Sequence, residues 1–278
     1  MRLVTMRTAT GTRAGRIEGD EVVELGFADV GALLASGPQW AEQAASADGA
    51  RHRRDEVDLA TLVPNPSKIF CVGLNYQSHI DETGSPRPTH PSYFAKFARA
   101  LVGANDPIVL PVVSDQVDWE VELTLVIGRP ARHVAEADAA QHVAGVTVAN
   151  DISVRDWQKR TSQNLAGKTF ESSTPVGPAL VTLDELPNGW GDLTVRCEVD
   201  GTVMQQGNTS ELLFSSEELI ADLSKIVTLD PGDLILTGTP SGVGRTRTPP
   251  VFLREGQTVR TAIDGVGELV NTCVAEKP

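Results

Sequence analysis

The stretch Val117-Asp118-Trp119-Glu120-Val121-Glu122-Leu123-Thr124-Leu125-Val126-Ile127-Gly128 alternates between apolar and polar residues with a period of two. Successive side chains of a β-strand point to opposite faces, so this pattern predicts a strand with two different sides. One side carries Trp119, Val121, Leu123, Leu125 and Ile127, and the other carries Asp118, Glu120, Glu122 and Thr124. Glu120 and Glu122 would lie close enough to share one cation. Without a cation, their like charges would raise one pKa or destabilise the strand.

A strand with one solvated acidic face is common, and this stretch alone favours that interpretation. A second stretch, Val146–Asp151 (VTVAND), shifts the balance because it is an apolar run that ends in an acid. Three carboxylates without paired cysteines or histidines make an all-oxygen site. Such a site suits Mg²⁺ or Mn²⁺, with Ca²⁺ as a third candidate, and disfavours zinc. We therefore predict that Glu120, Glu122 and Asp151 hold a divalent metal.

Charge and composition narrow the range of partners. The 278 residues carry a formal net charge of -13. Such a surface repels nucleic acid and anionic membranes, so we expect neither as a partner. An acidic protein that binds an anionic substrate would need a cation at its site. The N-terminus lacks the apolar core of a signal peptide, and no apolar run approaches the ~20 residues of a membrane helix. Three cysteines without metal-ligand spacing fit buried thiols, so a cytoplasmic location is expected.

The chain divides near a proline-containing break at residues 64–67. Before it, residues 2–25 predict short strands and residues 29–47 one or two short helices, so a small β-rich domain is expected over residues 1–64. After it, residues 65–278 predict a second, predominantly β domain. Its elements are strands at 68–73 and 233–237, hairpins at 195–204 and 258–274 with Asp-Gly turns, and helices at 136–143 and 215–227. Ser215 and Glu218 form a capping box at the start of the last helix. The fold class is mixed α+β.

Three further motifs carry polar groups. His79 and Glu82 are three residues apart, so one helical turn would let Glu82 orient His79 as a general base. Taken alone, the motif favours a surface histidine beside an acid. The loop Gly238–Gly244 (GTPSGVG) follows a strand without a P-loop or dinucleotide signature; it predicts either an anion-contacting loop or a tight turn. Lys96 and Lys168 taken alone read as surface residues.

In their order along the chain, these segments resemble the fumarylacetoacetate hydrolase family in its short prokaryotic-type form. The matching stretches are VGLNYQSHIDETG (72–84), DPIVLP (106–111), VDWEVELTLVIG (117–128), VAGVTVANDISVRDWQ (143–158), GKTFESSTPVGPAL (167–180), QQGNTSELLFS (205–215) and LDPGDLILTGTPSGVG (229–244). They cover most of residues 68–245, and so many ordered motifs are far more specific than any one of them. Residues 97–99 and 161–166 depart from the family's common pattern, which leaves the identity of the substrate open.

The resemblance implies a β-sandwich-like roll around a metal, usually in a homodimer, with a small N-terminal domain. It implies that Glu120, Glu122 and Asp151 are the metal ligands and that His79 and Glu82 form a water-activating pair on a mobile lid. It assigns Lys168 to the developing enolate together with Arg155 and Gln158, and it places Thr239 in a loop that faces the substrate. Lys96 or Arg99 would meet a distal carboxylate, as in fumarylpyruvate.

The expected activity is hydrolysis of a C–C bond in a 2,4-dioxo acid of the acylpyruvate or fumarylpyruvate type. His79 would take a proton from water, which attacks the 4-carbonyl. Cleavage of the C3–C4 bond then leaves a pyruvate enolate, whose charge develops against the cations of the site. Oxaloacetate decarboxylation, keto–enol isomerisation and 2-hydroxyhepta-2,4-diene-1,7-dioate isomerisation are alternatives on the same platform. An alternative of another class is a non-catalytic protein that binds a keto acid or metal.

Overall fold

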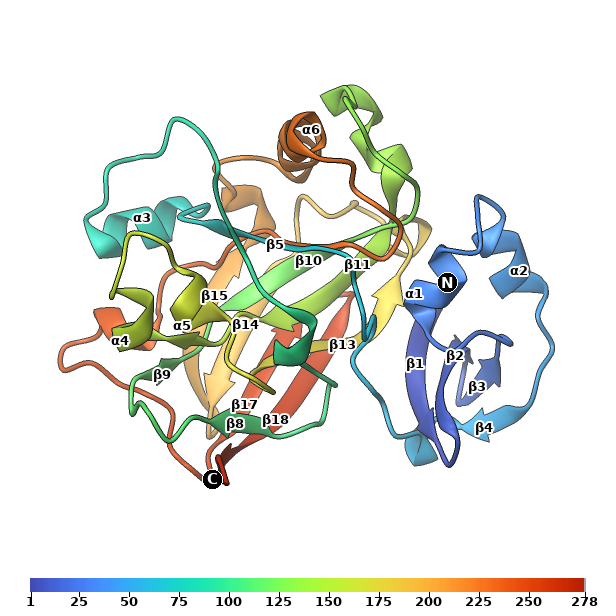
Figure 1. The fold of residues 1–278 in the computed structure, drawn as a ribbon, viewed down its shortest axis with the longest axis horizontal. Helices are drawn as coiled ribbons and strands as arrows, with labels where there is room; N and C mark the ends of the chain where they lie inside the picture. The colour runs from blue at the N-terminus through green and yellow to red at the C-terminus, as the bar shows by residue number, and fades with distance from the viewer. Residues whose placement is uncertain (278) are drawn as a thin grey trace.

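The computed structural model describes residues 1–277 and contains two β-sheets that pack face to face (Figure 1). The larger sheet has the order β4 (Arg51–Arg53), β3 (Glu21–Glu24), β2 (Gly11–Glu18), β1 (Arg2–Thr8), β13 (Thr174–Val181), β11 (Val143–Asn150), β10 (Val121–Ile127), β16 (Leu234–Leu236), β5 (Ile69–Gly73) and β6 (Ser92–Ala95), and β7 (Leu101–Val102) pairs with β13. The smaller sheet has the order β15 (Thr202–Asn208), β14 (Thr194–Val199), β17 (Thr258–Ile263), β18 (Gly267–Ala275) and β8 (Ile108–Leu110). Strands β9 (Val117–Asp118) and β12 (Ser153–Val154) form a separate pair.

The helices are short and lie around the sheets. They are α1 (Val30–Leu34), α2 (Trp40–Ser46), α3 (Gln77–Thr83), α4 (Arg155–Gln158), α5 (Leu165–Lys168) and α6 (Ser216–Ile226). Short 3₁₀ turns are η1 (Arg54–Glu56), η2 (Ala98–Ala100), η3 (Glu136–His142), η4 (Leu183–Glu185), η5 (Thr209–Glu211) and η6 (Gly244–Thr246). The predicted fold class, a mixed and predominantly β protein, is confirmed. The predicted helix at 136–143 is instead the 3₁₀ segment η3.

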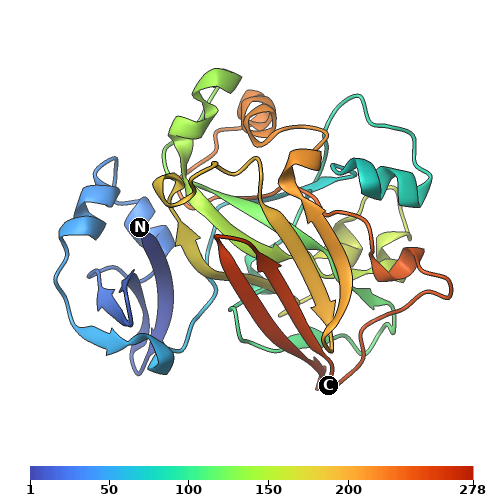
Figure 2. The same cartoon turned by 180° about the vertical axis from the view of Figure 1, so that it is seen from behind.

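Strand β10 is buried on both faces. The smaller sheet covers one face, and the cluster of polar side chains lies on the other. Val121, Leu123 and Leu125 pack into the core between the two sheets, where they meet apolar residues of β14, β17 and β18. Burying such side chains contributes about 1.5–3 kcal/mol each. Figure 2 shows the hairpins β14–β15 and β17–β18 in front of the larger sheet, as this packing requires. The two-sided strand predicted from the alternating sequence is therefore present.

The N-terminal strands extend the larger sheet. Strand β1 pairs antiparallel with β13, with Arg2 opposite Val181 and Leu3 opposite Leu180. Helices α1 and α2 cover this end, and their apolar residues belong to a core that also includes residues of β5 and β16. The first strands lie at one side of the molecule in Figure 1, away from α3 and α4. The domain division at residue 64/65 remains a prediction.

Local sequence signals locate several elements well. Helix α6 begins after Ser215, whose side chain accepts a hydrogen bond from the backbone of Glu218 while Glu218 caps in return. Both Asp-Gly hairpins form, at β14–β15 and β17–β18.

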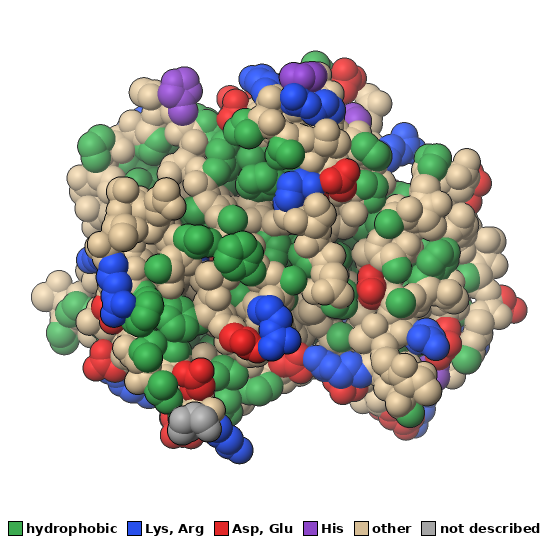
Figure 3. All heavy atoms as spheres, viewed as in Figure 1, with side chains coloured by type: hydrophobic (Ala, Val, Ile, Leu, Met, Phe, Trp, Pro, Cys, Tyr) green, Lys and Arg blue, Asp and Glu red, His purple; other side chains and the backbone are tan. Residues whose placement is uncertain are grey.

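All three cysteines are buried free thiols. On the face shown in Figure 3, acidic and basic side chains are interspersed rather than gathered by sign. Within residues 1–277 no helix is long and apolar enough to cross a membrane.

Candidate active site

Three carboxylates meet where β10 and β11 lie side by side. Glu122 lies on β10, Glu120 directly precedes that strand, and Asp151 directly follows β11. The backbone N–H of Asp151 donates to the Glu120 carbonyl at 2.8 Å, which holds the two residues opposite each other. One oxygen atom from each of the three carboxylates lies within 4.8 Å of the others, and all three residues are buried. The interpretation of a solvated acidic face is therefore wrong.

Cations surround two of the three acids. The Lys168 ammonium lies 2.6 Å from Glu120 Oε2 and 2.6 Å from Asp151 Oδ2. The Arg155 guanidinium lies 2.7 Å from Glu120 Oε1. Lys96 donates to Asp151 Oδ1 at 2.6 Å from the far side. Lys96 and Lys168 are each only 2% exposed, so their interpretation as surface residues is wrong.

The pKa values of Glu120 and Glu122 shift in opposite directions although both residues are buried. Burial alone would raise the pKa of Glu120, but Lys168 and Arg155 outweigh it and hold that pKa below its usual range. Burial, together with repulsion from Asp151 and Glu120, raises the pKa of Glu122 well above its usual value. Glu122 accepts one hydrogen bond, from the backbone N–H of Gly238 at 2.7 Å. Of the three acids, Glu122 forms no ion pair with the described residues, and the oxygen donors of the cluster fit a hard divalent cation.

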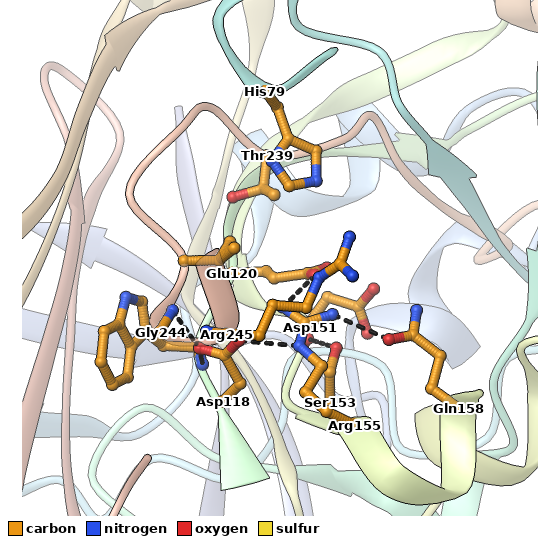
Figure 4. A network of polar contacts seen from close by, with 12 residues as sticks. His79, Asp118, Glu120, Asp151, Ser153, Arg155, Gln158, Thr239, Gly244 and Arg245 are labelled. Atoms are coloured by element: carbon orange, nitrogen blue, oxygen red, sulfur yellow. Dashed lines mark hydrogen bonds and ion pairs between the residues drawn. The ribbon is translucent and has the colours of Figure 1, made fainter. Parts of the chain in front are cut away.

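Helix α3 holds the predicted base over this cluster. His79 Nδ1 lies 2.7 Å from Glu82 Oε1, one helical turn away. The other oxygen of Glu82 accepts hydrogen bonds from the Gly242 N–H at 3.0 Å and the Thr246 hydroxyl at 2.9 Å. These three bonds outweigh the effect of burial and lower the pKa of Glu82. Figure 4 shows His79 above Glu120, with Arg155 and Gln158 approaching from the opposite side.

Asp118 organises the wall of the site, a role that the sequence did not reveal. Its carboxylate accepts from Arg155 Nε at 2.7 Å and from the backbone N–H groups of Gly244 at 2.7 Å and Arg245 at 3.0 Å. A side chain at Gly244 would collide with the Val251 carbonyl and crowd Asp118, so the turn needs glycine. Arg155 in turn donates to Gln158 Oε1 at 3.0 Å. One buried carboxylate thus fixes both a predicted substrate residue and the loop after Thr239.

Thr239 is oriented by a second buried residue that sequence reasoning missed. Gln205 Nε2 donates to Thr239 Oγ1 at 2.8 Å and to the Pro240 carbonyl at 2.9 Å. Its Oε1 accepts from the Val121 N–H at 3.0 Å, so the amide can take only one orientation. Because Thr239 Oγ1 already accepts a hydrogen bond from Gln205, its own proton remains for another acceptor. The motif QQGNTS was a sequence signal for Gln205, but nothing in it indicated this contact.

Most of these groups line one cavity of about 370 Å³, although Asp151, Glu82, Asp118 and Gln205 are not among its lining residues. Its lining contains His79, Glu120, Glu122, Arg155, Gln158, Lys168 and Thr239, and also Arg245, Lys159 and Asn164, which the sequence did not single out. The only hint of Arg245 was a basic residue directly after the glycine-rich loop.

Two expected substrate contacts are not supported. Lys96 is not among the residues that line the cavity; its ammonium bonds Asp151 and the Ile152 carbonyl, so it braces the acid cluster from behind. Arg99 is exposed and pairs with Glu171, so it does not face the cavity either. The prediction that either residue meets a distal carboxylate needs correction, because each cation already has a carboxylate partner elsewhere.

The profile of the C-terminal domain of fumarylacetoacetate (FAA) hydrolase matches residues 68–274. The chain belongs to the fumarylacetoacetate hydrolase family. The predicted family is thus confirmed, and the chain is an enzyme of that family. The matched range includes all the residues that line the cavity.

Relatives in the fumarylacetoacetate hydrolase family differ in their named activities. "Oxaloacetate tautomerase FAHD2A, mitochondrial" from Homo sapiens is 49% identical over 223 residues, which is 80% of this chain and 71% of that protein. A crystal structure of a putative HpcE protein from Mycobacterium smegmatis is 39% identical, with a TM-score of 0.91 over the full length of both chains. The maleylpyruvate hydrolase from Sphingobium sp. SYK-6, solved with manganese(II) and pyruvate, is 32% identical, with a TM-score of 0.80 and full coverage of both chains.

Proposed function

We propose that this chain is a divalent-metal-dependent enzyme that moves a proton next to the 2-oxo group of a small keto acid. The observation that carries the proposal is the position of the His79 ring in the cavity and its contact with Glu82. Its ring lines the same cavity as Glu120 and Glu122, and its Nδ1 lies 2.7 Å from a carboxylate that fixes the ring. With Nδ1 held by Glu82, Nε2 is the nitrogen left to exchange a proton with substrate or water.

The remaining residues bind the substrate and stabilise charge. Glu120, Glu122 and Asp151 would hold Mg²⁺ or Mn²⁺, which when bound supplies Lewis acidity at the carboxylate and 2-oxo group of the substrate. Arg155 and Lys168 are buried cations beside Glu120, so they would stabilise negative charge that develops on an enolate oxygen. Gln158 and Thr239 would orient the substrate by hydrogen bonds.

The first candidate reaction is keto–enol tautomerisation of oxaloacetate or a similar 2-oxo dicarboxylic acid. It needs one group that takes a proton from carbon 3 and gives a proton to the enolate oxygen on carbon 2, and His79 is the group proposed for that transfer. The relative named as an oxaloacetate tautomerase shares 49% of residues over four fifths of this chain, which favours this reaction over the hydrolysis that the sequence put first.

The second candidate is hydrolysis of 2,4-dioxo acids such as acylpyruvates and fumarylpyruvate. Here His79 would take a proton from water, water would add to carbon 4, and the C3–C4 bond would break to give an acid and a pyruvate enolate, which is then protonated. The His79–Glu82 pair suits water activation, and a similar fold carries a maleylpyruvate hydrolase. Decarboxylation of oxaloacetate and isomerisation of 2-hydroxyhepta-2,4-diene-1,7-dioate are alternative reactions for the same site.

One experiment separates these candidates. We would measure kcat/KM with Mg²⁺ or Mn²⁺ on enol-oxaloacetate, acylpyruvates and fumarylpyruvate, and follow decarboxylation separately. We expect tautomerisation to have the highest kcat/KM and His79→Ala to lower it about 10²–10⁴-fold. His90→Ala removes an exposed histidine near α3 and serves as the matched control, with activity unchanged. If His79→Ala keeps full tautomerase and hydrolase activity, the proposed role of His79 is wrong.

The expected surroundings of the enzyme remain proposals. We propose a keto-acid substrate, a homodimer and a cytoplasmic location, and no nucleic-acid or membrane partner. Light scattering at micromolar concentration would test the homodimer, because a monomer mass would contradict it. Fractionation of cells that express the chain would test the location.

A further inference from the structure

Arg245 is a cation in the cavity whose charge lacks a hydrogen-bonded acid. It lies in the turn η6, which Asp118 anchors through the backbone N–H groups of Gly244 and Arg245. Its Nε is buried and has no hydrogen-bond partner among the described residues. Figure 4 shows its side chain extending from this turn toward Glu120.

Arg155 lines the same cavity as Arg245 and serves as the comparison, because it is paired with acids and Arg245 is not. Arg155 forms close ion pairs with Asp118 and Glu120, and these raise its pKa against the effect of burial. Burial and the positive charge of Arg155 lower the pKa of Arg245. Glu120, Asp118 and Glu82 oppose this shift only by charge attraction, without a hydrogen bond to the guanidinium, and do not outweigh it. Lys168 is likewise paired, with Glu120 and Asp151. Of these three cations, Arg245 alone has its hydrogen-bonding edge left for a ligand.

A half-buried guanidinium without an acid partner is costly unless an anion arrives to meet it. The planar fork of arginine matches a carboxylate with two parallel hydrogen bonds. The acid cluster and any cation it holds would bind one end of the substrate, and Arg245 enters the same cavity from a separate turn.

We propose that Arg245 is a specificity-determining residue that binds the second carboxylate of a 2-oxo dicarboxylic acid. The inference rests on the proposed function, because it takes the 2-oxo acid end to lie at Glu120, Glu122 and Asp151. It accounts for an unpaired cation that the proposed proton transfer itself does not use. It selects diacids of the oxaloacetate type over monoacids of similar size.

The test compares two ligands with a common 2-oxo acid end. Oxaloacetate carries a distal carboxylate, and 4-methyl-2-oxopentanoate has an uncharged branched group of similar shape in its place. We would titrate each into the Mn²⁺-loaded chain by calorimetry, and also measure KM and kcat for oxaloacetate. The variants are Arg245→Met, which keeps length without charge, and Arg245→Lys, which keeps charge without the fork. Arg53→Met removes an exposed arginine outside the cavity and is the matched control.

For Arg245→Met we expect the Kd of oxaloacetate to rise about 10- to 100-fold, as for loss of a charged hydrogen-bonded pair, with the Kd of 4-methyl-2-oxopentanoate unchanged. KM should rise more than kcat falls, and Arg245→Lys should restore part of the affinity. Equal weakening of both ligands, or no change in either, would overturn the proposal. Binding of oxaloacetate that depends on Arg245 without any turnover would instead contradict the proposed function and leave this inference standing.

Discussion

The floor and the roof of the cavity are built in different ways. The floor is the strand pair β10–β11, with Glu120, Glu122 and Asp151 buried at its end. The roof is helix α3, seven residues long, which Glu82 ties to the loop after β16 through Gly242 and Thr246. The floor therefore concentrates charge in a rigid frame, while a few hydrogen bonds position the base. This contrast predicts large losses of stability from floor variants and smaller, pH-dependent losses of stability from roof variants.

The largest expected effect lies within the floor itself. Asp151→Asn removes the partner of two buried ammonium groups, Lys96 and Lys168, so we expect a loss of about 3 kcal/mol in unfolding free energy. Glu122→Gln should leave the stability of the metal-free chain unchanged or raise it. It removes a charge that burial, Asp151 and Glu120 disfavour, and the new amide oxygen can still accept from Gly238. Urea unfolding in the presence of a chelator measures both. Equal destabilisation by the two variants would contradict the asymmetry between these acids.

A smaller effect on stability is expected at the roof, and its size depends on pH. The pKa of Glu82 is lowered on folding, so its contribution to stability is present above its ordinary pKa of 4.5 and is lost as pH falls through the folded value. Glu82→Gln should cost ~1 kcal/mol at pH 7, a value kept low because the group is partly exposed, and little in strong acid. Unfolding curves at several pH values check this. A cost that grows as pH falls would show that the carboxylate does not hold the roof.

The smallest expected effect concerns Thr239. Gln205→Met should leave the Thr239 hydroxyl free to turn away from the cavity, because the Nε2 donor that orients it is lost. We expect KM for the keto acid to rise about 3- to 10-fold, as for one hydrogen bond, with kcat changed less. Thr239→Val should produce the same change, and the double variant should add little. Additive losses would show that Gln205 acts elsewhere.

The sequence predicted the floor better than the roof and walls. A period of two was enough to place Glu120 and Glu122 on one face of a strand, because strand geometry fixes which side chains share a face. The acid at the end of the second strand and the family resemblance then added Asp151. Burial could not be read in the same way. The acidic face looked solvated although α3, α4 and α5 cover it, and Lys96 and Lys168 looked like surface residues although they neutralise Asp151.

The missed contacts join residues that lie far apart in sequence. Asp118 holds Gly244 across 126 positions, and Gln205 holds Thr239 across 34. Local propensity carries no information on such contacts, which the packing of separate loops creates. Arg245 was missed for the same reason, since nothing near it in sequence shows that it lacks an acid partner.

The most direct test of the account is a calorimetric titration of the chelator-treated chain with Mn²⁺, compared with Glu122→Gln. We predict one ion per chain in the unchanged protein, at least about 100-fold weaker binding in the variant, and recovery of keto-acid turnover in step with metal occupancy. Glu122→Gln is the suitable variant because its fold is expected to stay intact. Full turnover in the presence of chelator, or unchanged Mn²⁺ binding by Glu122→Gln, would contradict the claim that these three carboxylates hold the metal.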